Sequence, residues 1–119
     1  MKVSSQSNEE YYFEEGCYIR ELLNTADDPA LSIAQARVES GQSTLWHRLE
    51  GIEERYLILS GRGEVEVGDR EREPVGPGDL VRIPAGVRQR IHNAGECDLL
   101  FLALCTPRFV PSAYRALES

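Results

Sequence analysis

Lysine is almost absent from this chain of 119 residues: Lys2 is the only one, and arginine supplies the rest of the basic charge. Acidic residues outnumber basic residues by 20 to 13, which gives a net charge of −7. Nucleic-acid binding requires lysine and arginine clustered against the phosphates, and here the sequence holds no cluster larger than a pair such as Arg88 and Arg90. The charge balance therefore argues against a nucleic-acid partner.

Long apolar segments are also missing. The chain has no run of about 18 apolar residues, so no transmembrane helix and no membrane partner are expected. The N-terminal residues are polar and lack the apolar region of a secretory signal. Cys17, Cys97 and Cys105 form no CxxC pair, and their odd number predicts reduced thiols instead of a disulfide framework. Together these features predict a cytoplasmic protein.

Amphipathic helices and several catalytic motifs are absent as well. The sequence contains no GxSxG, no HExxH and no glycine-rich phosphate loop leading into a helix. Instead, short alternating stretches are separated by turns rich in glycine and proline, which is typical of one all-β barrel or sandwich domain. Strands are predicted within residues 11–23, 31–38, 55–59, 64–67, 71–75, 80–83, 87–92 and 99–105.

One stretch has a distinctive spacing. Gly41 is followed by His47, then by Glu54 and by Gly61. This spacing resembles the first motif of the cupin superfamily, G-x5-H-x-H-x4-E-x6-G. Leu49 occupies the position of the second histidine in that motif.

A second stretch resembles the second cupin motif, G-x5-P-x-G-x2-H-x3-N. Gly78, Pro84, Gly86 and Asn93 match it, and Gln89 stands where the motif has histidine. The resemblance covers residues 33–107 and implies a double-stranded β-helix, or jelly-roll barrel. We expect a flexible N-terminus over residues 1–10, a barrel domain over 11–107 and a tail over 108–119 that forms helical turns near residues 111–118.

The resemblance also implies a homodimer. An open sheet has edge strands that need cover, and the strand-like region over residues 11–23 could pair with a partner subunit.

In the family pattern, the inward-facing motif residues hold a divalent metal ion. The matching residues here are His47, Glu54 and Gln89, with the non-ligating Leu49 at the fourth position. One imidazole, one carboxylate and one amide can hold Mn, Fe, Ni or Zn only weakly. The alternative is a metal-free barrel in which His47 hydrogen-bonds Glu54 or Gln89. Both interpretations stay open at this point, and no organic cofactor is expected.

Strand periodicity adds further candidates. Tyr56 shares a face with Glu54, because residues two apart in a strand point to the same side. Arg37, on an earlier strand, could pair with a ligand carboxylate if it faces the cavity. The catalytic candidates are therefore Glu54, Tyr56 and Arg37. His92 points away from the face of Gln89 by the same rule.

Three functions are compatible with these residues. The resemblance implies a metal-dependent enzyme, isomerase-like or dioxygenase-like, acting on a small oxygen-rich ligand such as a sugar acid or keto acid. The second is a metal-free protein that binds a small ligand as a sensor or accessory subunit. The third is a metal-free enzyme in which Glu54 and His47 act as an acid–base pair.

Overall fold

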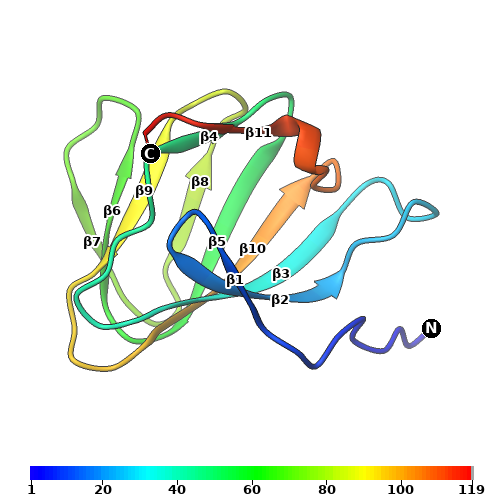
Figure 1. The fold of residues 1–119 in the computed structure, drawn as a ribbon, viewed down its shortest axis with the longest axis horizontal. Coiled ribbons are helices and arrows are strands. Elements are labelled where there is room, and N and C mark those ends of the chain that lie inside the picture. The colour runs from blue at the N-terminus through cyan, green and yellow to red at the C-terminus, as the bar shows by residue number, and fades with distance from the viewer. Residues whose placement is uncertain (119) are drawn as a thin grey trace.

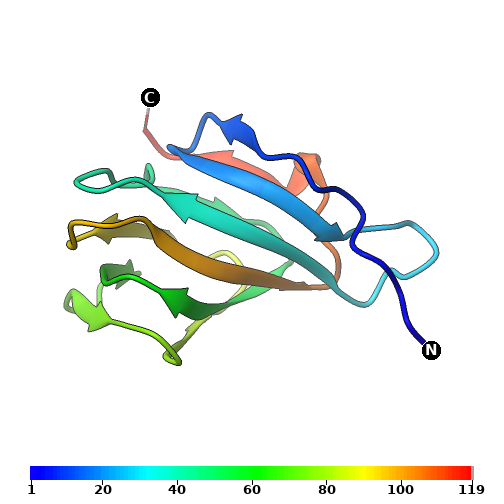
Figure 2. The same cartoon turned by 90° about the horizontal axis from the view of Figure 1, so that it is seen from below.

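The computed structural model describes residues 1–118 and shows two facing antiparallel sheets (Figures 1 and 2). The first sheet has the order β1-β2-β3-β10-β5-β8 and the second the order β11-β4-β9-β6-β7. The elements are β1 (Tyr11–Phe13), β2 (Cys17–Leu23), β3 (Ser32–Val38), β4 (His47–Leu49), β5 (Glu53–Ser60), β6 (Gly63–Val67), β7 (Glu73–Val75), β8 (Leu80–Ile83), β9 (Gln89–Asn93), β10 (Leu99–Thr106), the 3-10 helix η1 (Pro111–Ala113) and β11 (Tyr114–Ala116). This arrangement confirms the all-β fold predicted from the sequence.

Alternation along the strands decides which side chains enter the barrel. On β5, Glu54, Tyr56 and Ile58 are buried between the sheets, and the residues between them face outward. The apolar run on β10 is buried on its inward face only. Its outward residues, among them Leu102, remain partly exposed, because no further layer covers the six-stranded sheet in the described chain.

The core consists of two clusters. The larger one, at the end of the barrel that contains the β5–β6 turn, includes the fully buried Val38, Ile58, Ile91 and Leu99. A smaller cluster around Ile52 lies where β4 meets the C-terminal segment. Members of both clusters line a cavity between the sheets.

The N-terminal residues expected to be flexible make specific contacts. The backbone N–H of Gln6 donates to the carbonyl oxygen of Leu22 at 3.0 Å, and that of Ser7 donates to Glu21 at 3.1 Å. The Glu10 carboxylate pairs with an arginine of β3. These contacts lay the N-terminal segment along β2.

The C-terminal tail belongs to the barrel. Only Pro111–Ala113 forms a helical turn, and Tyr114–Ala116 continues as β11 instead of a helix. The reason is that the backbone of β11 finds hydrogen-bond partners on β4, with Tyr114 opposite Leu49. Figure 1 shows this red segment beside β4 at one end of the barrel.

The strands over residues 11–23 pair within their own chain. Tyr11 lies opposite Ile19 in the β1–β2 hairpin, and Tyr18 lies opposite Arg37 between β2 and β3. The edge of β3 is thus covered without a partner, and the homodimer stays a prediction. The part of the chain that the structure describes has no helix suited to crossing a membrane.

Gly61 ends the first motif at a point where two strands approach closely. Its φ is +85°, and an added Cβ would lie 2.5 Å from the carbonyl oxygen of Asp98 and 2.9 Å from the Cα of Leu99. We therefore expect Gly61→Ala to lower the free energy of unfolding by roughly 2–4 kcal/mol in urea titrations. Gly76→Ala is the matched control, since its Cβ would meet no atom within 4 Å. Equal losses in the two variants would contradict this account.

Candidate functional site

A cavity of about 250 Å³ lies between the sheets at the end of the barrel closed by β1 and the C-terminal segment. Ala34 and Ala36 of β3 leave room for it, because their side chains are small. The rings of Phe13, Phe101 and Tyr114 form much of the apolar wall. The size and lining suit a small organic molecule.

His47 is held in one orientation at the cavity wall. Its ring is buried, with 2% of the residue exposed. Nδ1 lies 2.7 Å from the carbonyl oxygen of Leu45, and Nε2 lies 3.1 Å from Oε1 of Glu15. A carbonyl oxygen only accepts hydrogen bonds, so Nδ1 carries a proton. The contact between Nε2 and Glu15 then contains one further proton, which the imidazole and the carboxyl group share.

The environment favours the neutral form of this pair. Burial lowers the pKa of His47 and raises the pKa of Glu15 to about 7. Both shifts place the shared proton on the carboxyl group, which donates to Nε2. The thiol of Cys17 donates to Oε2 of Glu15 at 3.5 Å, and the ring of Tyr114 stacks on the imidazole with centroids 5.3 Å apart.

A second hydrogen-bonded chain runs through Gln89. Its amide NH2 donates to Oε1 of Glu54 at 2.7 Å, and its carbonyl oxygen accepts a hydrogen bond from the Tyr56 hydroxyl. The Cys105 thiol donates to the other carboxyl oxygen of Glu54 at 3.8 Å. Each neighbour of Glu54 in this chain is a donor, which favours the carboxylate form. Burial nevertheless raises the pKa of Glu54 to about 7, and repulsion from Glu15, whenever that group is ionised, adds to the rise.

The structure brings together most of the residues singled out in the sequence. His47, Leu49, Glu54 and Tyr56 line the cavity, and Gln89 lies directly behind Glu54 and Tyr56. The hydrogen-bond partner expected for His47 differs, since Glu15 takes the place predicted for Glu54 or Gln89.

Arg37 is a catalytic candidate on the condition that it faces the cavity, and the structure does not meet that condition. Ala34 and Ala36 of β3 face inward, so alternation turns Arg37 to the outer face of the sheet. There its guanidinium bonds Glu10 at 3.0 Å and Asp98 at 3.3 Å. It cannot reach a ligand in the cavity from that side.

Glu15 and Tyr114 are the site residues that sequence reasoning missed. Glu15 lies in the β1–β2 turn, outside both motifs, before Gly16, whose φ is +106°. A glycine between two predicted strand segments signals this turn, but the sequence does not show that Glu15 points inward. Tyr114 lies in the tail, where no motif marks it.

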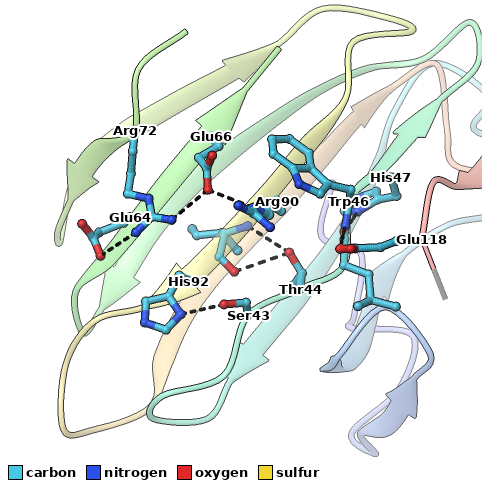
Figure 3. A network of polar contacts seen from close by, with 12 residues as sticks. Ser43, Thr44, Trp46, His47, Glu64, Glu66, Arg72, Arg90, His92 and Glu118 are labelled. Carbon is cyan, nitrogen blue, oxygen red and sulfur yellow. Dashed lines mark hydrogen bonds and ion pairs between the residues drawn. The ribbon is translucent and has the colours of Figure 1, made fainter. Parts of the chain in front are cut away.

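The outer face of the five-stranded sheet has its own polar network (Figure 3). His92 points to this side, with Nδ1 2.6 Å from the Ser43 hydroxyl, in agreement with strand parity. The guanidinium groups of Arg88 and Arg90 lie 4.3 and 4.5 Å from the centroid of the Trp46 ring. None of these side chains lines the cavity.

The residues at the family's metal positions do not fit a resident cation. The free nitrogen of His47 is directed at Glu15, and the oxygens of Glu54 and Gln89 already accept hydrogen bonds. Leu49 offers no lone pair. Within residues 1–118, no three His, Cys, Asp or Glu side chains form a group able to hold a metal ion. A bound cation would have to break both hydrogen-bonded chains.

The cupin domain family model matches residues 34–105. The chain belongs to the cupin family. An uncharacterised protein of Methanocaldococcus jannaschii is 36% identical to this cupin over 110 residues, which covers 91% of this chain and 87% of that protein. The resemblance inferred from the two motifs is thereby confirmed.

Several solved structures share the fold. KdgF from Halomonas sp. has a TM-score of 0.75 at 22% identity, covering 86% of this chain and 90% of that one. A protein described as a predicted oxalate decarboxylase from Thermotoga maritima has a TM-score of 0.78 at 26% identity, with coverage of 90% and 99%. Pac13, a nucleoside dehydratase from Streptomyces, has a TM-score of 0.80 at 18% identity, with coverage of 99% and 92%. These similarities establish the double-stranded β-helix and leave the activity to the site itself.

The raised pKa of Glu54 predicts a pH-dependent stability. The folded state holds this proton more tightly than the unfolded state, so the stabilisation is complete below the ordinary value of 4.5 and is lost as pH rises to about 7. We expect the unfolding free energy of the wild type, measured in urea, to fall between about pH 5 and about pH 8. In Glu54→Gln this fall should be smaller by roughly 2–3 kcal/mol, because the titrating carboxyl group is gone.

Glu53→Gln is the control for this experiment. Glu53 is the preceding residue on β5, faces outward and has its pKa lowered by the guanidinium of Arg82. It therefore stays ionised throughout the same pH range, and its variant should follow the pH dependence of the wild type. If the unfolding free energy of Glu54→Gln changed with pH as steeply as that of the wild type, the raised pKa of Glu54 would be refuted.

Proposed function

We propose that this cupin is a metal-independent enzyme that binds a small organic molecule in its cavity and transfers protons to and from it. One observation carries the proposal. Two carboxyl groups with raised pKa values, Glu15 and Glu54, line the same cavity as the fixed imidazole of His47. Groups that exchange protons near neutral pH are suited to general acid–base catalysis.

The hydrogen bonds assign different roles to the two carboxyl groups. Glu54, surrounded by donors, acts as the base and accepts a proton from a carbon next to a carbonyl group. The bonding electrons of that C–H bond form a C=C bond, and the carbonyl oxygen takes the proton shared by Glu15 and His47. The π electrons of the C=O bond move to its oxygen, so the product is an enol. Return of a proton from Glu54 to the same carbon, with the enol proton going back to the Glu15–His47 pair, regenerates the carbonyl compound and completes a cycle of proton exchange.

Tyr56 and Gln89 have positioning roles in this scheme. The hydroxyl proton of Tyr56 is directed to Gln89, so the phenolic oxygen presents a lone pair to a ligand. Gln89 in turn orients the Glu54 carboxylate. Proteins of the same fold include a nucleoside dehydratase and a protein described as a predicted oxalate decarboxylase, which supports catalysis in such a barrel by analogy.

A divalent metal held by His47, Glu54 and Gln89 is the alternative that the family resemblance implies. The proposal does not use it, because each of these side chains already has a partner for the atom that would bind the ion. A late first-row metal ion held by three weak protein ligands and water would gain little binding free energy to offset the loss of those hydrogen bonds.

Proton transfer can be tested by deuterium exchange. We expect the wild type to catalyse exchange in D2O of the α-protons of small cyclic or aromatic ketones that carry a hydroxyl group, followed by NMR. Glu54→Gln should slow the exchange by at least about 100-fold, because the base is lost. Glu53→Gln, which alters a carboxylate outside the cavity, should retain the wild-type rate. If ketones bind but the wild type shows no exchange, the protein is a non-catalytic binding protein.

Metal addition provides a second test. We expect about 0.1 mM Mn²⁺, Fe²⁺, Ni²⁺ or Zn²⁺ to change the Tm of the wild type by less than about 1 °C. The double variant Leu49→His with Gln89→His completes the family's ligand set and is the positive control. Its Tm should rise by more than about 5 °C with Zn²⁺ or Ni²⁺. Near-stoichiometric metal in wild-type protein purified without chelator would overturn the metal-independent proposal.

A further inference from the structure

The cavity is lined by several carboxyl groups, and its one basic group among the described residues is the imidazole of His47. Glu15, Glu21 and Glu54 line it, and within residues 1–118 no arginine or lysine does so. Strand alternation explains this asymmetry. Arg37 and Arg55 each adjoin a cavity-lining residue in the sequence. Strand alternation turns both arginines to the outer face of the sheet, where they pair with carboxylates.

This charge pattern opposes the entry of an anion. A buried anionic ligand loses its hydration and needs a cationic or strong hydrogen-bond partner in return. Here it would instead lie near the carboxyl groups of Glu15 and Glu54, and like charges in one buried site raise the cost of ionising each other. The sugar acid or keto acid expected from the family resemblance therefore finds no partner for its carboxylate.

Two of the groups that form the wall offer hydrogen-bond acceptors to a ligand. The Tyr56 hydroxyl already donates to Gln89 and keeps a free lone pair, and the Glu54 carboxylate only accepts. Aromatic faces from Phe101 and Tyr114 complete the wall, and such faces attract flat apolar groups as well as cations. A complementary ligand brings a planar body and N–H or O–H donors.

We propose that the cavity selects planar, non-anionic ligands that carry N–H or O–H donors and that it excludes carboxylic acids. The inference deepens the proposed function, since it assigns a ligand class to the same cavity, but it concerns binding and not turnover.

Three probes of nearly equal size and shape test the charge preference. Benzamide is neutral, benzamidine is cationic and benzoate is anionic, and each is titrated into the full chain near neutral pH by NMR. We expect benzamide and benzamidine to bind at least roughly tenfold more tightly than benzoate. Benzoate binding as tightly as benzamide would overturn the inference, and so would a failure of all three probes to bind.

Variants locate the preference in the cavity. Glu15→Gln and Glu54→Gln keep the side-chain shape and remove a carboxyl group, so each should bring benzoate closer to benzamide in affinity. Glu53→Gln, outside the cavity, should leave the ratio unchanged. Ala103→Leu fills the cavity and should weaken binding of all three probes. An unchanged ratio in both Glu15→Gln and Glu54→Gln would overturn the assignment to these carboxyl groups.

The two proposals fail separately. Selective binding without deuterium exchange would reject the proposed proton transfer and keep the ligand class. Exchange by Glu54 with equal affinity for benzoate and benzamide would reject the ligand class and keep the proton transfer.

Discussion

The cavity of this protein depends on keeping the carboxyl groups of Glu15 and Glu54 and the imidazole of His47 in an apolar enclosure that no described arginine or lysine lines. Desolvation makes an isolated charge costly there, so each group needs a proton or a hydrogen-bond donor from a neighbour. Glu15 shares a proton with His47, and Glu54 accepts from Gln89 and Cys105. The same constraint leaves these protons available for exchange near neutral pH, which connects the stability of the site with its proposed chemistry.

The two residues that depart from the cupin motif make this arrangement possible. Leu49 offers neither a metal-binding lone pair nor a hydrogen-bonding group to the cavity wall. Gln89 joins Tyr56 to Glu54, because its carbonyl oxygen accepts from the hydroxyl and its NH2 group donates to the carboxylate. A histidine at residue 89 could offer one nitrogen to a metal ion, but it could not present a carbonyl oxygen to the Tyr56 hydroxyl. Relative to the motif, the chain thus lacks two metal-binding histidines and has a hydrogen-bonded chain from Tyr56 to Glu54 in the same barrel.

Elements outside the two motifs complete the site. The β1–β2 turn supplies Glu15, and the C-terminal segment supplies Tyr114, whose ring stacks on His47. Both segments close the same end of the barrel, although they lie about a hundred residues apart in the chain. The two motifs alone therefore do not account for the cavity wall, because Glu15 and Tyr114 also line it.

The sequence by itself determined the barrel, the bounds of most strands within a few residues and the shared inward face of Glu54 and Tyr56. It did not predict β4, and it predicted helical turns where β11 lies. Glycine and proline spacing sets the turns, and alternation sets relative faces, so local chemistry is sufficient for both. Alternation on β3 could not say which of its two faces is internal, because the outer face of the six-stranded sheet is also partly apolar. Only the tertiary structure turned Arg37 outward and brought Glu15 to His47, since those positions depend on packing between segments distant in sequence.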